Sequence, residues 1–148
     1  TQFDGLGHIG VQRGRDGDRT EMRFYNGLSE QEIASSDGLL KLGIEHIKPI
    51  VTRGHLIDAA GLKGRMLEGG EEISLADVRA ALSRQGMRED DIRQGDAILF
   101  HTGWGRLWMK DNARYAATNP GIGLEVARWV ADRGLCLTAS HHYLNELG

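Results

Sequence analysis

The chain has 148 residues, a length typical of one ordinary domain. Hydrophobic residues make up 40% of it, charged residues 26% and proline only 2 positions, which excludes collagen-like and disordered chains. The formal net charge of −3 comes from 18 basic and 21 acidic side chains that are interspersed along the sequence. No region is charged strongly enough to recruit nucleic acid or an anionic membrane, so we expect neither as a partner.

Cysteine content and the chain ends bear on where the protein works. The single Cys136 cannot form an internal disulfide, which favours a reducing, cytoplasmic setting. The apolar runs are far shorter than the roughly 20 residues that cross a bilayer, and no signal-peptide pattern opens the chain. The sequence starts at Thr1 without a methionine. We therefore expect residues 1–148 to be one domain that lacks amino- and carboxyl-terminal parts of a longer protein.

The amino-terminal segment predicts irregular structure followed by a short helix. Residues 5 to 28 are rich in glycine and show little periodicity, which indicates a loop or an irregular hairpin. A loop of this length is usually either functional or mobile. Ser29 is followed three residues later by Glu32, the capping-box spacing that predicts the start of a helix.

Strand and helix signals alternate through the middle of the chain. Residues 50 to 58 are rich in β-branched side chains and predict a strand. Ser74 and Asp77 form a capping box at the start of an amphipathic helix over 75 to 85, which Gly86 ends. The run from 97 to 100 is apolar at every position, which predicts a strand buried on both faces.

The last part of the chain continues this alternation. Pro120 and Gly121 open a second helix, with apolar residues at helical spacing from Leu124 onward, and Gly134 stops it. Residues 135 to 139 predict a further strand, in which we expect Cys136 to be buried and therefore a poor nucleophile. The order of elements predicts an α/β fold with a parallel core and functional groups at the strand ends.

Three short motifs suggest ligands but lack the context that these ligands need. Residues 5 to 10 match G-x-G-x-x-G, yet no apolar strand precedes them and no helix pattern follows, so we do not expect a nucleotide site. Asp16 and Asp18 lack the further acidic residues that a calcium-binding loop requires, so we expect a solvated turn there. His141 and His142, together with Glu146, offer a His-x-x-x-Glu spacing that would place two zinc ligands on one helical face, but no third ligand is in view.

The residues Gln2, Asp4 and His8 form a more informative group. In an extended segment positions 2 and 4 project to the same side, and a turn at Gly5 to Gly7 would fold His8 back toward them. A divalent metal such as zinc or manganese accepts this set of ligands, and His8 could also act as an acid or base. The alternative reading is a solvated aspartate beside a partly buried histidine.

The segment from Thr1 to His8 resembles the Thr-His-x-Asp-x-Pro-x-His core of the cyclase family of metal-dependent hydrolases, which includes kynurenine formamidase and isatin hydrolase. The resemblance continues almost to the end of the chain, through Tyr25-Asn26-Gly27, Gly54-His55-Leu56-Ile57-Asp58, Gly95-Asp96-Ala97-Ile98-Leu99-Phe100-His101-Thr102-Gly103-Trp104 and the segment from Leu124 to Asp132. It implies a swivelling β/β/α fold.

The resemblance also implies roles for individual residues. Asp4 would bridge the metal, and His8 would be a metal ligand or the catalytic acid and base. Gln2 stands where the family has a metal-binding histidine, and an amide oxygen is a weaker ligand. Leu6 replaces the family's proline, and the remaining ligands of the family would lie before Thr1 and after Gly148.

Two functions of different classes remain open. The first is a metal-dependent hydrolase of cyclic or N-acyl amides, similar to the arylformamidase of tryptophan catabolism, in which a metal-activated water attacks and His8 moves the proton. Phe3, Tyr25 and Trp104 would line its apolar substrate pocket. The second is a non-catalytic relative that binds a ligand or assembles into oligomers. For the hydrolase we expect a small-molecule amide as substrate and a homo-oligomer as the assembled form.

Overall fold

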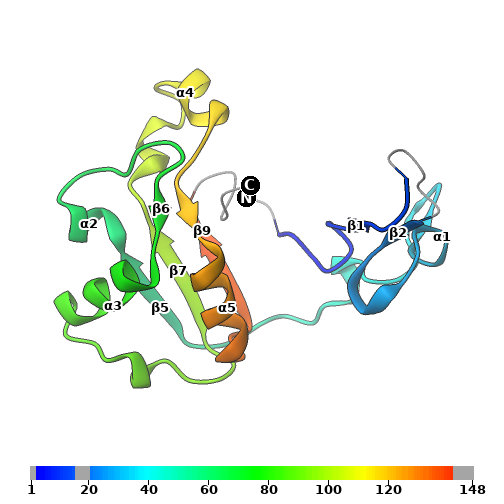
Figure 1. Cartoon of the computed structure of the whole chain (residues 1–148), viewed down its shortest axis with the longest axis horizontal. Coiled ribbons are helices and arrows are strands. Elements are labelled where there is room, and N and C mark those ends of the chain that lie inside the picture. Colours follow the sequence, from blue (N-terminus) through cyan, green and yellow to red (C-terminus); the bar gives the residue numbers. More distant parts are fainter. Residues whose placement is uncertain (1–2, 16–20, 142–148) are drawn as a thin grey trace. The chain divides into compact units, whose positions relative to one another are not determined.

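The computed structural model describes residues 3–15 and 21–141. Within it the chain forms two compact units, Thr1–Ile50 and Val51–Gly148. Figure 1 labels elements of both units along the chain. No helix in the described residues combines the length and the apolar character that crossing a membrane requires.

The first unit is built from very short elements, as its glycine-rich sequence predicts. Two antiparallel ladders, β1 with β2 and β3 with β4, pair two residues on each strand. The capping box is present, because the Ser29 amide and hydroxyl both donate to Glu32 Oε2 at 2.9 Å. Its elements are β1 (Val11–Gln12), β2 (Met22–Arg23), the 3-10 helix η2 (Tyr25–Gly27), α1 (Glu30–Ile33), β3 (Ala34–Ser35), β4 (Gly38–Leu39) and η3 (Ile44–His46).

The second unit is an α/β structure around a parallel sheet. Three strands form this sheet in the order β5-β7-β9, and a smaller parallel pair joins β6 to β8. Its elements are β5 (Gly54–Asp58), α2 (Ala59–Lys63), β6 (Glu72–Ile73), α3 (Leu75–Arg84), η4 (Glu89–Asp91), β7 (Ala97–His101), η5 (Trp104–Leu107), α4 (Asn112–Ala117), β8 (Gly121–Ile122), α5 (Leu124–Asp132) and β9 (Leu137–Ser140). The predicted α/β class is therefore confirmed.

The longest helix, α3, forms where the sequence predicts it, whereas α5 starts later than expected. Gly121 belongs to strand β8, where it pairs with Glu72, so α5 begins only at Leu124 rather than at Pro120 and Gly121. Helix α3 is opened by the predicted capping box, in which Ser74 Oγ accepts from the Asp77 amide at 3.1 Å and donates to Asp77 Oδ2 at 2.8 Å. Gly86 and Gly134 follow α3 and α5 with φ of 70° and 62°, a conformation that glycine adopts without strain. Both helices lie on the same face of the central sheet (Figure 1).

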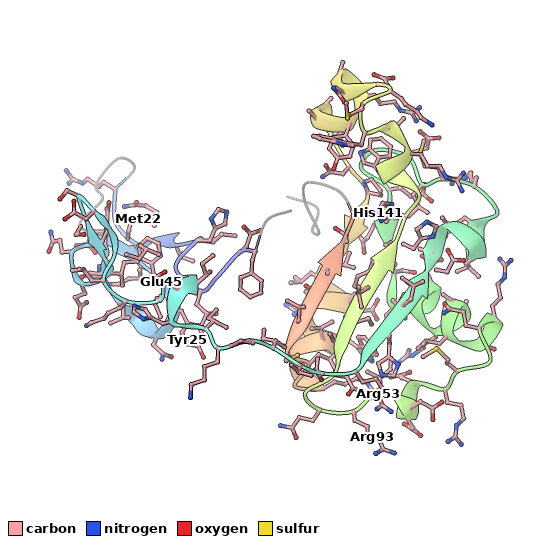
Figure 2. The ribbon with its side chains drawn as sticks, turned by 180° about the vertical axis from the view of Figure 1, so that it is seen from behind. Met22, Tyr25, Glu45, Arg53, Arg93 and His141 are labelled. Atoms are coloured by element: carbon pink, nitrogen blue, oxygen red, sulfur yellow. The ribbon has the colours of Figure 1, made fainter. Side chains whose placement is uncertain are left out.

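Only one face of the central sheet is buried in the described structure. Ile57, Ile98 and Phe100 point into the helix-covered core and are at most 2% exposed. Their neighbours Leu56 and Leu99 point to the opposite face and are 51% and 39% exposed. Figure 2 shows this second face with the strands in front of the helices. The expectation that the strand over 97–100 is buried on both faces is thus wrong for the part of the chain described.

The expectation that Cys136 is buried is also wrong. Cys136 is exposed, and it precedes β9 rather than lying inside it. Its amide donates to the carbonyl of Asp96 at 3.0 Å, so the backbone is fixed while the side chain stays accessible. The apolar neighbours Leu135 and Leu137 suggest burial, but this position falls between the turn after α5 and the first paired residue of the strand.

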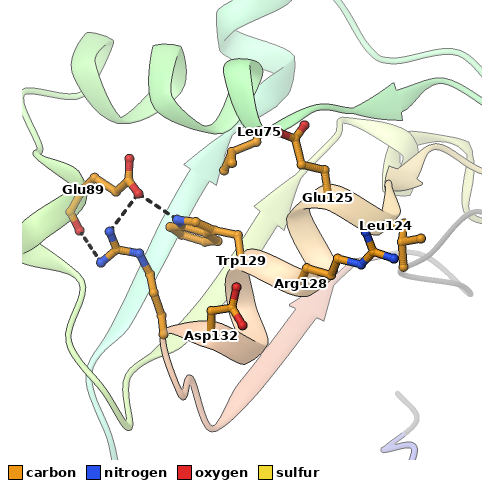
Figure 3. Close-up of a pocket in the computed structure, with 8 residues that line it drawn as sticks. Leu75, Glu89, Leu124, Glu125, Arg128, Trp129 and Asp132 are labelled. Carbon is orange, nitrogen blue, oxygen red and sulfur yellow. Dashed lines mark hydrogen bonds and ion pairs between the residues drawn. The ribbon is translucent and has the colours of Figure 1, made fainter.

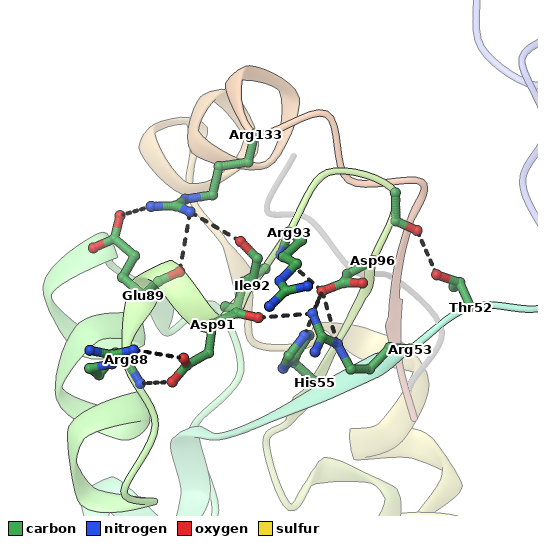
Figure 4. A network of polar contacts seen from close by, with 11 residues as sticks. Thr52, Arg53, His55, Arg88, Glu89, Asp91, Ile92, Arg93, Asp96 and Arg133 are labelled. Atoms are coloured by element: carbon green, nitrogen blue, oxygen red, sulfur yellow. Dashed lines mark hydrogen bonds and ion pairs between the residues drawn. The ribbon is translucent and has the colours of Figure 1, made fainter.

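A polar network fixes the amino ends of β5 and β7 (Figure 4). Asp96 Oδ2 accepts from Arg53 at 2.7 Å and from the Arg93 amide at 2.9 Å, and it lies 2.8 Å from His55 Nε2. The Arg53 guanidinium is the main cause that holds the pKa of Asp96 far below its usual range. This carboxylate ties the start of one strand to the loop before the next and has a structural role.

Candidate functional site

The first unit brings Asp4 and His8 together, as the sequence predicts. The His8 amide donates to the Gly5 carbonyl at 3.0 Å, which closes the expected turn. His8 Nε2 then lies 3.6 Å from Asp4 Oδ1, with both side chains about half exposed. A carboxylate and an imidazole therefore lie next to each other at a partly exposed place. Their roles in catalysis and metal binding stay predictions.

The other residues predicted for this site are less closely grouped. Gln2 lies outside the described residues. Phe3 and Tyr25 are 41% and 52% exposed, so both offer aromatic surface within the first unit. Trp104 belongs to the second unit and is only 1% exposed. Its indole Nε1 donates to the Tyr115 carbonyl at 3.3 Å, so in this structure it packs as a core residue rather than lining an open pocket.

The described residues contain no group of three or more His, Cys, Asp and Glu side chains that could hold a metal ion. Asp4 and His8 supply two donors of suitable chemistry, a carboxylate oxygen and an imidazole nitrogen. These two donors are suitable ligands for a divalent metal but make up only part of a complete ligand set.

The remaining ligand motifs gain no support. Over residues 3–15, the structure has no strand before Gly5–Gly10 and no helix after it, because the next element is the two-residue strand β1. In this described segment the glycine motif lacks the dinucleotide context. The Asp16–Asp18 turn, His142 and Glu146 fall outside the described residues.

A second constellation, which the sequence reasoning missed, lies at the carboxyl ends of the parallel strands. Asp58 ends β5 and His101 ends β7, and the two are partners in the strand register. His101 Nδ1 lies 2.7 Å from Asp58 Oδ1. The edge at which parallel strands end is the usual place for functional groups in α/β proteins. Figure 2 shows His141 at this end of the sheet, with Arg53 and Arg93 at the other.

Hydrogen bonding orients this pair and keeps Asp58 ionised. The bond to His101, followed by the bond from the Gly61 amide, holds the pKa of Asp58 below its usual range. Asp58 is therefore a carboxylate at neutral pH and accepts the Nδ1 hydrogen of His101, which leaves Nε2 as the ring nitrogen that faces away from this bond. The His141 ring stacks on His101 with 5.2 Å between ring centroids. Burial, together with the neighbouring His101, lowers the pKa of His141, so this ring favours the neutral state.

The Asp58–His101 pair lines a pocket of about 340 Å³. Several other residues of the wall come from α2, the loop after it and the end of α3. The wall is rich in arginine, and its residues are Asp58, Ala60, Gly61, Gly64, Arg65, Met66, Arg84, His101 and Arg106.

A larger hollow of about 490 Å³ lies beside α5, between Leu75, Glu89 and Trp129 (Figure 3). Its principal polar groups are bonded to one another. Glu89 Oε1 accepts from Trp129 Nε1 at 2.8 Å and from Arg133 at 2.7 Å. These contacts join α5 to η4, so we assign this network a structural role.

One signal in the sequence would have found Asp58 and His101. Each is the polar residue that ends a predicted apolar strand, and in a parallel sheet such positions meet at one edge. Their pairing depends on strand register, which the sequence does not state.

Comparison with known proteins places the chain in a family. The Cyclase family model matches residues 1–141. No curated protein matches the chain. A crystal structure described as that of a novel cyclase is similar over 93% of this chain, with 31% sequence identity and a TM-score of 0.72. The chain covers 44% of that protein and so spans less than half its length. Since the family model covers nearly all of the sequence, the chain belongs to the cyclase family.

Proposed function

We propose that the chain is part of a metal-dependent hydrolase that acts on cyclic or N-acyl amides, with an arylformamidase-like reaction. The observation that carries this proposal is the approach of His8 Nε2 to Asp4 Oδ1, at 3.6 Å, in the segment that resembles the family's metal-binding core. Membership of the cyclase family supports it.

His8 performs the proton transfer in this proposal. Its imidazole is 55% exposed and adjoins the Asp4 carboxylate, so it can take a proton from an attacking water and return it to the departing nitrogen. Asp4 and Gln2 would hold the divalent ion, zinc or manganese. His8 would be a further ligand only where it does not move the proton, because a metal-bound ring nitrogen has no lone pair left to accept one. When bound, such an ion polarises the amide carbonyl and makes water a better nucleophile. Phe3 and Tyr25 offer aromatic surface for an aryl substrate.

A second candidate is a non-catalytic member of the family that binds a ligand or assembles into oligomers. Gln2 favours it, because the resemblance places a metal-binding histidine at that position. Metal content separates the two candidates, since a non-catalytic protein purifies without stoichiometric zinc or manganese.

The experiment uses the full-length protein with added zinc or manganese and a panel of N-formyl aromatic amines and cyclic amides. We expect His8→Ala to abolish turnover and Gln2→His to tighten metal binding, measured by metal analysis after dialysis. His46→Ala is the matched control, because His46 is also exposed and lies 3.4 Å from a carboxylate of the same unit, Glu45. Wild-type rates in His8→Ala would refute the catalytic role, and a protein that binds no metal and hydrolyses nothing would establish the second candidate.

A further inference from the structure

The pocket at the carboxyl ends of β5 and β7 has the charge of an anion site. Arg65 is neutralised by Glu71, to which it donates two hydrogen bonds of 2.8 and 3.0 Å. Arg84 and Arg106 also line the pocket, and neither forms an ion pair with any residue that the structure describes. Asp58 contributes one negative charge. The wall therefore carries one net positive charge when His101 is neutral, which matches a ligand with one negative charge.

Guanidinium groups and a fixed imidazole also define the shape of that ligand. The planar donors of arginine match the two oxygens of a carboxylate. His101 Nδ1 is engaged by Asp58 at 2.7 Å, so the nitrogen that remains for a ligand is Nε2, a hydrogen-bond acceptor in the neutral ring. A ligand that satisfies both features has a carboxylate and an O–H or N–H donor close to it.

The size of the pocket limits the rest of the molecule. Its volume of about 340 Å³ is at the lower end of the range for small-molecule sites, roughly 300–1,000 Å³. The pocket is open to solvent, because the side chains that line it are partly exposed. The Asp58 side chain, for example, is 41% exposed. A small, soluble ligand fits these properties better than a large apolar one.

We propose that this pocket binds a small organic monocarboxylate that carries a neighbouring hydroxyl or amino donor. Arg84 and Arg106 hold its carboxylate, and His101 Nε2 accepts the hydrogen of the donor. The site uses only residues of the second unit and is independent of the proposed chemistry at Asp4 and His8. A variant that no longer binds the carboxylate can therefore still be assayed for hydrolysis, and a variant that no longer hydrolyses amides can still be assayed for carboxylate binding.

Lactate and propionate serve as probes, because they differ by the one hydroxyl that His101 would bind. Titration of the native chain, followed by NMR, should show lactate binding about threefold to tenfold more tightly than propionate. Arg84→Gln and Arg106→Gln should each weaken lactate binding about tenfold. Arg128→Gln is the matched control, because Arg128 is an exposed arginine on α5 that lines the other hollow, and lactate affinity should not change.

His101→Asn isolates the acceptor. The asparagine amide nitrogen can still donate to Asp58, but the side chain has no group at the position of Nε2. We expect this variant to bind lactate and propionate equally. The proposal is overturned if wild type does not distinguish the two acids, if both arginine variants bind lactate as wild type does, or if inorganic phosphate binds more tightly than lactate. Circular dichroism of each variant verifies that it is folded.

Discussion

Replacing Glu89 with Gln tests how much one carboxylate contributes to the stability of the second unit. Glu89 accepts hydrogen bonds from Arg79 at 2.8 Å, from Trp129 at 2.8 Å and from Arg133 at 2.7 Å. The bond from Arg79 is the largest cause that lowers the pKa of Glu89 from 4.5 to about 2. Glutamine keeps the shape and one acceptor oxygen but removes the charge.

The shift in pKa gives the magnitude. One pKa unit corresponds to about 1.4 kcal/mol, so ionised Glu89 contributes up to roughly 3 kcal/mol to the free energy of unfolding. The side chain is 26% exposed, and solvent screening reduces the expected loss in Glu89→Gln to about 1–3 kcal/mol at pH 7. Because the folded pKa is depressed, this stability is complete above about pH 4.5 and disappears as the pH falls through about 2.

Urea unfolding followed by circular dichroism, repeated between pH 7 and pH 2, measures the effect. The difference between wild type and Glu89→Gln should be largest at pH 7 and should shrink steadily below pH 4.5. Asp90→Asn is the control, since Asp90 is exposed and adjacent, and its replacement should change stability by less than about 0.5 kcal/mol. A difference between wild type and Glu89→Gln that stays constant with pH would refute the reasoning, because it would show that lost packing rather than lost charge causes the effect.

Three further predictions concern packing, capping and accessibility. Phe100→Ala should lower the free energy of unfolding by about 3–5 kcal/mol, measured by urea titration, because Phe100 is 2% exposed; a loss below about 1 kcal/mol would contradict its place in the core. Ser74→Ala should cost about 1 kcal/mol in the same assay by removing the capping box of α3, and an unchanged midpoint would show that the cap contributes nothing. Cys136 should react with a thiol reagent in the native protein, because it is exposed, and absorbance should reveal one thiol without denaturant; reaction only after unfolding would show that it is covered.

The elements of the second unit were predictable where local rules determine them. Helix α3 has a capping box at Ser74 and a glycine after its end, and both act within a few residues of the chain. Burial of only one face of the sheet, in contrast, is not determined by local rules. The run Ala97–Phe100 has the same sequence whether one face or two faces are covered, and the covering layer comes from distant segments. The exposure of Cys136 likewise depends on where pairing with β7 begins.

The candidate site divides in the same way. Asp4 and His8 are four residues apart, and the turn between them follows from the intervening glycines, so their approach could be predicted. Asp58 and His101 are 43 residues apart, and only the register of β5 on β7 makes them neighbours. The charge balance of their pocket depends further on Glu71 neutralising Arg65, a contact with no sequence signature.

The strand order β5-β7-β9 also has a consequence for synthesis of the chain. Each strand joins the sheet beside its predecessor, so one edge of β7 has no partner until β9 has left the ribosome. About 35 residues separate His101 from Leu137, which at 5–20 residues per second corresponds to roughly 2–7 s of translation. During that interval the apolar strand β7 presents free backbone groups, the kind of edge that promotes aggregation. The speed of translation over residues 102–136 therefore sets how long the nascent chain is vulnerable.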